Sequence, residues 1–191
     1  FKGDAFTLTP NEIHLWTPDD PYLYHFTIET GEDRVDSYFA LREIGISKVN
    51  GISRLTLNGE PYLFNGLLDQ GYWSDGMLTY PSDQAAEDEI RMLREMGFNT
   101  IRKHIKLEPM RWYYHCDRLG MLVWQDFVNG GGHYQFTHIA AFPFLGFRHK
   151  DSDYRYFARE DADARAHFLQ TAEDTVRQLQ NCVSIALWVP F

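Results

Sequence analysis

In the first fifty residues, short apolar runs alternate with polar, turn-forming stretches, a pattern typical of β-structure. Aromatic and β-branched runs predict strands over residues 12–16, 23–29 and 36–41. Turn-forming residues separate them at 18–21 and 30–33, so the last two strands are expected to form a hairpin. Three strands are too few to close a sandwich, and we interpret residues 1–50 as the last strands of an immunoglobulin-like β-sandwich.

The segment that follows carries two glycine-containing turn signals. Residues 44–53, with Gly45 and Gly51, are predicted to form the linker into a second domain. Asn58-Gly59 lies between two alternating runs directly after it. Because this dipeptide accepts positive φ at both turn positions, it predicts a β-hairpin there.

From residue 62 onward, short apolar runs alternate with helical stripes. Strands are predicted over residues 62–68, 99–105 and 121–126 and from residue 183, and residues 127–159 are predicted to form a loop-like insertion. Helices are predicted from Ser82 or Asp83 to Gly97, from Pro109 to Gly120, and over residues 161–179. Their inner stripes are expected to be Ala86, Ile90, Leu93 and Met96 or Gly97; Trp112, Cys116 and Leu119; and Ala162, Ala166, Leu169, Ala172 or Glu173, Val176 and Leu179.

Four parallel strands joined by three helices predict an α/β fold for residues 51–191. This is the first half of a (β/α)₈ TIM barrel, or most of a doubly wound sheet. No Gly-x-Gly-x-x-Gly follows the first strand, which disfavours a nucleotide-binding sheet. The run Gly130-Gly131-Gly132 lies inside the insertion, so we predict a flexible loop there and not a phosphate cradle.

The composition is that of a globular protein, with 44% hydrophobic and 24% charged residues. The net charge of -9 argues against nucleic acid or an anionic membrane as a partner. Both Cys116 and Cys182 are expected to be small buried side chains. Since the chain does not begin with methionine, we take it to be part of a longer protein, and bacterial cytoplasm and periplasm both stay open.

Polar and aromatic residues recur where the predicted parallel strands end. Because the carboxyl ends of such strands share one edge, their side chains are expected to meet there. Amides, a carboxylate, cations and indoles together suit a polyhydroxylated ligand, so a carbohydrate is the expected partner. The candidate substrate-binding residues are Asp69, Gln70, Trp73, Arg102, Lys103, His104, Trp124, Asp126 and Trp188, with Gln125 beside them.

Other chemistries are less well supported by the sequence. His133, His138 and His149 have irregular spacing and no matched carboxylates, so we expect no metal and no other cofactor. A Gly-x-Ser-x-Gly nucleophile elbow is absent from the sequence.

Five stretches occur in one order along the chain. They are LWTPDDPYLY at 15–24, REIG at 42–45, LNGEP at 57–61, MGFNTIR at 96–102, and a helix with Trp112, Tyr113, Cys116, Asp117 and Gly120. Together they resemble the motifs of glycoside hydrolase family 2, which comprises β-galactosidases, β-glucuronidases and β-mannosidases. The resemblance covers nearly the whole chain.

The resemblance implies a retaining mechanism with two glutamates, one as acid/base and one as nucleophile. In the family the acid/base glutamate follows an asparagine after the fourth barrel strand, and residues 184–188 resemble the lead-in to it. Phe191 stops just short of that pair, so we expect no catalytic residue within this chain and no activity from it alone. Arg102 resembles the arginine that orients the nucleophile, and His104 resembles a histidine near the sugar.

Three hypotheses remain open from the residues. The chain is either part of a β-galactosidase-like or β-mannosidase-like glycosidase, or a complete non-catalytic carbohydrate-binding or scaffolding module. A doubly wound enzyme with a nucleotide ligand is the third hypothesis. Half a barrel would leave apolar strand edges open, so self-association through these edges is expected for the first alternative.

Overall fold

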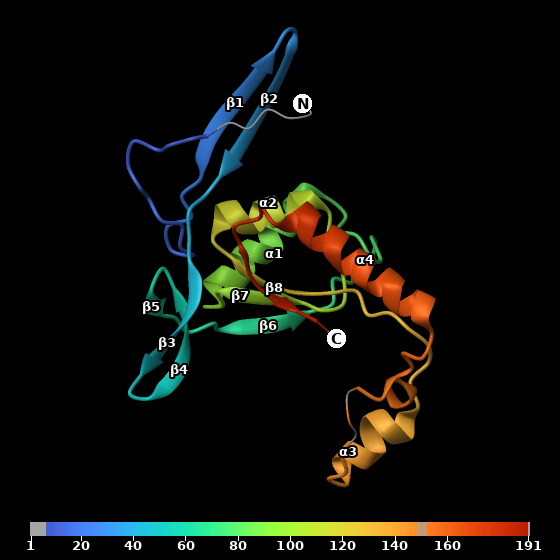
Figure 1. Ribbon diagram of the computed structural model, residues 1–191. Coiled ribbons are helices and arrows are strands. Elements are labelled where there is room, and N and C mark those ends of the chain that lie inside the picture. Colours follow the sequence, from blue (N-terminus) through green and yellow to red (C-terminus); the bar gives the residue numbers. More distant parts are fainter. Residues whose placement is uncertain (1–6, 149, 151, 191) are drawn as a thin grey trace.

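The computed structural model describes residues 7–148, 150 and 152–190, and His149 and Phe191 lie outside them (Figure 1). Its strands form three sheets: an antiparallel pair, a small three-stranded sheet and a parallel four-stranded sheet. The antiparallel pair and the small sheet lie to one side of the parallel sheet, and an insertion with short helices projects from the other side. The candidate site belongs to the parallel sheet.

The N-terminal region contains the predicted hairpin, formed by β1 (Tyr24–Thr30) and β2 (Asp33–Phe39). The strand predicted over residues 12–16 is wrong, because only Leu15 makes a β-bridge there, with Leu41. Trp16 is fully buried, and its indole nitrogen donates a hydrogen bond to the backbone oxygen of Asp117 at 2.7 Å. This segment is therefore held by a side chain in the core and not by a strand ladder.

Residues 44–53, predicted to link the two domains, form most of a hairpin of β3 (Ile44–Val49) and β4 (Ile52–Leu57), and the domain boundary stays a prediction. Asn50 and Gly51 at its turn both have positive φ, 51° and 78°. The next turn repeats this chemistry, with φ of 53° at Asn58 and 85° at Gly59, and confirms the hairpin predicted there. It leads into β5 (Glu60–Pro61), so the expected boundary at residues 50 and 51 falls within a turn.

The parallel sheet consists of β6 (Gly66–Asp69), β7 (Thr100–Lys103), β8 (Leu122–Asp126) and β9 (Ile185–Val189), in that spatial order. Between them lie α1 (Asp83–Glu95), α2 (Met110–Leu119) and α4 (Ala162–Leu179). The Ser82 side chain caps α1 by accepting a hydrogen bond from the Ala85 nitrogen at 3.1 Å, and Gly120 ends α2 with φ of 75°. These signals confirm the predicted start of α1 and the predicted end of α2.

One hydrophobic core joins the helices to a single face of the parallel sheet. Ile101, Val123 and Ile185 are in register on neighbouring strands and are all buried. They share one cluster with buried residues of all three long helices, namely Ala86, Ile90, Leu93, Trp112, Tyr113, Cys116 and Leu179. Helices on one face and strands in sequential order differ from a doubly wound sheet, which has helices on both faces.

The predicted inner stripe of α4 is wrong in its first half, since Ala162 and Ala166 are exposed, whereas Val176 and Leu179 in the second half are half-buried and buried. Leu169 is exposed, and Thr175 and Leu179 are the buried residues of this helix within the described part of the chain. Figure 1 shows the cause, since only the C-terminal part of α4 lies over the sheet and its N-terminal part extends toward the insertion. The apolar residues early in the helix therefore have no sheet beneath them.

The insertion after β8 contains more structure than the predicted loop. A π-helical turn covers Thr137–Ala141, α3 covers Phe142–Phe144, and a 3₁₀ turn covers Tyr154–Phe157. The two cysteines are free and buried, as predicted. Among the described residues, no helix is both long and apolar enough to cross a membrane.

Candidate functional site

Alternate residues of the parallel strands face either the helices or the opposite, open face of the sheet. The open face carries a cavity of about 370 Å³, whose lining includes Phe64, Leu68, Thr100, Arg102 and Trp124. Arg102 of β7 and Trp124 of β8 are partners in the strand register, so the fold places a guanidinium beside an indole. Both were predicted site residues.

Arg102 and Asp126 form a two-point ion pair at the carboxyl end of this face. The Nε and Nη2 atoms of Arg102 donate to the two carboxylate oxygens of Asp126 at 2.9 and 3.1 Å. The Asp126 side chain is fully buried, whereas that of Arg102 is 36% exposed. These hydrogen bonds raise the pKa of Arg102 above its usual value. The Nη1 atom makes no hydrogen bond to a described residue, so the cation can receive a further acceptor.

Trp124 supplies an apolar surface and one donor next to this pair. Its ring lies 5.7 Å from that of Phe64, centre to centre, and is tilted by 47°. The indole Nε1 atom is buried and has no hydrogen-bond partner among the residues described. A buried donor without a partner is costly, so this nitrogen is suited to a hydroxyl acceptor.

Lys103, the residue after Arg102, faces the helices instead. Its Nζ atom contacts Asp69 and lies 2.9 Å from Glu108 Oε1 and 4.3 Å from the centre of the Trp112 ring. Burial alone would lower the pKa of Lys103, but the charges of Asp69 and Glu108 raise it above its usual value. The fold thus places Lys103 and Asp69 in contact with each other on the helix side, whereas Arg102 lies on the opposite face of the sheet.

The sequence did not indicate two members of this buried network, Glu108 and Lys106. Glu108 Oε1 accepts hydrogen bonds from Lys103 at 2.9 Å and from Lys106 at 2.8 Å. Gln125 also lies on this side, accepting from the Tyr113 hydroxyl at 2.6 Å and donating to the Lys106 backbone oxygen at 2.8 Å. The usable signal was the presence of two lysines, Lys103 and Lys106, in the seven residues before α2, because lysines at a buried strand end need a buried acid.

Two further predicted residues, Gln70 and His104, meet in a cavity of about 400 Å³ at the carboxyl edge. The loops after β6 and β7 form it, with Tyr72, Leu78 and Lys106. The Asp69 backbone oxygen accepts from the His104 nitrogen at 2.9 Å and so joins the two loops. This edge is accessible to a ligand, and His104 lies two residues after Arg102 in the chain.

The two remaining tryptophans have local partners. Trp73 is half-buried and makes a β-bridge with Met77. Trp188 of β9 packs against the helix-side core and stacks on Phe127, with ring centres 5.7 Å apart. The substrate roles of these residues, like those of the other seven, stay predictions.

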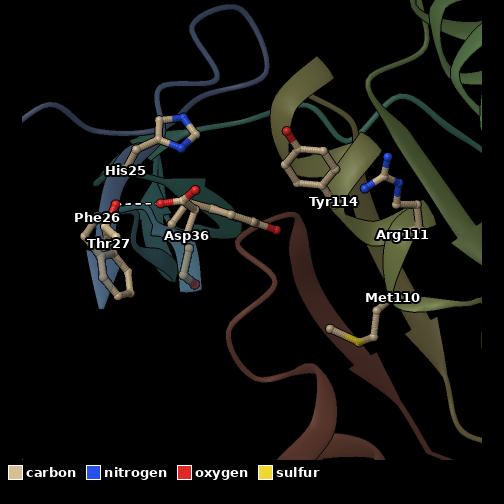
Figure 2. Close-up of a pocket in the computed structure, with 9 residues that line it drawn as sticks. His25, Phe26, Thr27, Asp36, Met110, Arg111 and Tyr114 are labelled. Carbon is tan, nitrogen blue, oxygen red and sulfur yellow. Dashed lines mark hydrogen bonds between the residues drawn. The ribbon is translucent and has the colours of Figure 1, made fainter. Parts of the chain in front are cut away.

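A larger cavity, of about 720 Å³, lies away from these residues between the β1–β2 hairpin and the outer face of α2 (Figure 2). His25, Thr27 and Asp36 lie on one side, and Arg111 and Tyr114 on the other. Thr27 donates a hydrogen bond to Asp36 at 2.6 Å. This groove contains no predicted site residue. Within the described residues, no group of three or more His, Cys, Asp or Glu could hold a metal.

Comparison with known proteins connects this geometry to one group of enzymes. No family model matches the chain. A β-galactosidase from Leuconostoc mesenteroides is 29% identical over 112 residues, which are 57% of this chain and 10% of that protein. A mannosylglycoprotein endo-β-mannosidase from Lilium longiflorum is 30% identical over 205 residues, 96% of this chain and 19% of its own length.

Solved structures show the same fold. A GH2 β-galacturonidase from Eisenbergiella tayi, bound to galacturonate, superposes with a TM-score of 0.69 at 18% identity, over 94% of this chain and 27% of that one. The chain thus spans between about a tenth and a fifth of the length of the two curated relatives. It is related to the glycoside hydrolases of family 2 and corresponds to a short part of these enzymes.

Proposed function

We propose that this chain is part of a retaining β-glycosidase. In this proposal residues 1–50 are the last strands of an immunoglobulin-like sandwich and residues 51–191 are the first half of a (β/α)₈ barrel. The sequential parallel order of β6 to β9, with all long helices on one face, supports the barrel. The match over nearly all of the chain, but over a small share of each relative, supports the partial domain.

The observation that carries the proposal is the open face with Arg102, Trp124 and Asp126. In a barrel the face opposite the helices lines the centre, and ligands bind at its carboxyl end. A guanidinium fixed by a buried carboxylate is a rigid donor for a carboxylate or a hydroxyl. An indole beside it offers a ring face for the C–H groups of a sugar.

Arg102 is assigned the role of orienting the nucleophile. Since Nε and Nη2 are held by Asp126, the arginine has one fixed direction for its remaining nitrogen. A glutamate carboxylate placed there would be kept ionised and aligned for attack. Trp124 and the pair Gln70 and His104 would then contact the sugar at the rim.

The carboxyl groups at this edge are unsuited to be the acid or the nucleophile. Retaining glycosidases need two carboxyl groups about 5–5.5 Å apart across the bond that breaks. Asp126 is bound to Arg102 and Asp69 to Lys103, and Glu108 lies on the helix side. Burial and the charge of Asp69 raise the pKa of Glu89, as an acid would require, but Glu89 belongs to α1 on the covered side. We therefore propose that the two catalytic glutamates lie outside these 191 residues and that the chain alone is inactive.

The substrate class is a β-linked sugar, with a β-galactosidase-like enzyme preferred and a β-mannosidase-like enzyme as the alternative. Relatives of both kinds match the chain, the β-galactosidase over 57% of it and the endo-β-mannosidase over 96%. A panel of aryl β-galactosides, β-mannosides and β-glucuronides distinguishes these possibilities.

The test compares the 191-residue chain with the protein encoded by the whole gene. We expect the chain to hydrolyse none of the aryl glycosides above a buffer control, and the whole protein to hydrolyse at least one with retention of configuration. The gene is expected to continue with Asn-Glu codons after Phe191. Hydrolysis by the chain alone, or inversion by the whole protein, would refute the proposal.

A further inference from the structure

The insertion between β8 and α4 holds a pocket that the candidate site does not use. Its volume is about 480 Å³, within the range of about 300–1,000 Å³ typical of small-ligand sites. Four aromatic rings and two guanidinium groups line it, from Tyr134, Tyr154, Phe157, Phe168, Arg159 and Arg165. We call it the insertion pocket.

The two arginines fix the rings of the insertion pocket. The Arg159 guanidinium lies 5.2 Å from the centre of the Tyr134 ring, and its Nη2 donates to the Tyr134 hydroxyl at 2.7 Å and to Asn129. The Arg165 guanidinium lies 4.6 Å from the Tyr154 ring centre, and its Nη1 donates to the backbone oxygens of Arg159 and Glu160 at 2.6 and 2.7 Å. Because both guanidinium groups are held by hydrogen bonds, they fix the positions of the aromatic rings that they contact, and we call this arrangement the frame of the pocket.

The glycine run 130–132 makes this frame possible. Gly131 has φ of 100°, and a Cβ atom on it would overlap the Arg159 guanidinium and the Ala158 oxygen. The Gly132 nitrogen donates to the Ala158 oxygen at 3.0 Å. The run is thus packed against the segment that carries Arg159, which differs from the flexible loop expected from its sequence. Glycine is required at 131 so that the guanidinium can reach Tyr134.

The insertion that holds the pocket begins at the carboxyl edge of the sheet, directly after β8. Asn129, which receives the Arg159 hydrogen bond, is three residues after Asp126. The Phe127 nitrogen donates to the Val189 oxygen at 3.0 Å, so the start of the insertion is fixed to β9. In Figure 1 the insertion leaves the sheet at the pointed ends of the strands. A ligand longer than one sugar, held at this edge, would extend toward the insertion.

We propose that the insertion pocket binds a pyranose ring of a β-linked oligosaccharide, beyond the sugar held at the open face of the sheet. This inference rests on the proposed function and adds to it a preference for extended glycans. The C–H face of a pyranose matches an aromatic wall, and the tyrosine hydroxyls offer hydrogen bonds to its edge. The rings of Tyr134, Tyr154, Phe157 and Phe168 all line the pocket and can provide such a wall.

The test measures binding to the intact 191-residue chain, which needs no catalytic residue. Isothermal titration and saturation-transfer NMR would use three probes: β-1,4-mannotetraose, β-1,4-galactotetraose and cellotetraose. We expect at least one to saturate the chain, and Tyr154→Ala to raise its Kd about two- to twelvefold, since one aromatic contact is worth about 0.5–1.5 kcal/mol. Phe144→Ala is the matched control, because Phe144 lies in the same insertion, is 92% exposed and does not line the pocket.

A second variant tests the frame without removing an aromatic ring. Gly131→Ala should displace Arg159 and weaken the same probe, while the far-ultraviolet circular dichroism spectrum stays unchanged. The proposal is overturned if no tetrasaccharide saturates the chain, if Tyr154→Ala and Phe144→Ala bind alike, or if 4-nitrophenol alone shows the Tyr154 dependence. Such a failure leaves the proposed function intact, because that is decided by hydrolysis and by the codons after Phe191.

Discussion

Two neighbouring cations of β7 have opposite surroundings on the two faces of the parallel sheet. Lys103 is 1% exposed beneath the helices, between Asp69 and Glu108, whereas Arg102 opens onto the cavity beside Trp124. The difference arises because consecutive strand residues point to opposite faces. On the covered face a charge stabilises only if acids surround it, and on the open face it remains available for a ligand. Of these two adjacent basic residues, Lys103 therefore has a structural role, and Arg102 has the ligand-side role that we propose for it.

The largest expected effect comes from Lys103→Met, which removes the cation of the covered face. The carboxylates of Asp69 and Glu108 would lose their shared cation inside the core. We expect the free energy of unfolding to fall by about 3–5 kcal/mol, the usual cost of breaking a buried ion pair from one side. Urea denaturation measures it, with Lys106→Met as the milder control because Lys106 is 14% exposed. A loss below about 1 kcal/mol would show that the buried network is not needed.

The second prediction concerns the open face. In the glycosidase of which we propose the chain to be part, Arg102→Lys should lower kcat/KM about 100-fold, or about 2.7 kcal/mol, because lysine cannot make the two-point contact with Asp126. The free energy of unfolding should change by less than about 1 kcal/mol, since the positive charge is retained. Steady-state kinetics and urea denaturation on the same protein separate the two effects. Equal activity of both proteins would exclude the positioning role.

A smaller, pH-dependent effect on stability is expected from the difference between two fully buried aspartates. Asp126 has an arginine, whereas Asp117 accepts hydrogen bonds from the Tyr38 hydroxyl and the Ser184 nitrogen, both at 2.8 Å. Burial raises the pKa of Asp117 from 3.8 to about 6, although these hydrogen bonds act in the opposite direction. Arg42 and the two cysteine thiols also lie within electrostatic reach of Asp117.

The sign of the pH effect follows from this raised pKa. The folded chain holds the proton more tightly than the unfolded chain, so this contribution to stability is greatest below about pH 4 and is lost as the pH rises through about 6. Between pH 4 and pH 7 the free energy of unfolding of the native chain should fall by about 2 kcal/mol more than that of Asp117→Asn. Urea denaturation of both proteins at several pH values measures this difference. A constant difference across that range would contradict the prediction.

The sequence predicted those elements whose local signals and tertiary packing agree. Ser82, Gly97 and Gly120 mark the ends of α1 and α2, and Ala86, Ile90 and Leu93 lie inside, as their spacing indicated. Local signals failed where long-range packing decides. The apolar residues at the start of α4 have no sheet beneath them, and Asn50-Gly51 was interpreted as part of a linker although it has the turn chemistry of Asn58-Gly59.

For the site, the sequence located the strand ends but not the direction of each side chain. The residues predicted at β7 separate into Arg102 on the open face and Lys103 on the covered face. A register shifted by one residue would exchange them, and only the sheet decides it. Glu108 was missed because its partners come from β7 and the following loop, so their proximity depends on how the chain turns after the strand.

The buried Trp16 has a consequence for how this polypeptide is made. Its indole hydrogen bond to Asp117 spans 101 residues of sequence. During synthesis the ribosome must deliver all of the intervening chain before this indole reaches its acceptor, a delay of about 5–20 s at about 5–20 residues per second. Until then the apolar side chain of Trp16, which precedes β1, stays uncovered, and we expect nascent chains halted before residue 117 to depend on chaperones.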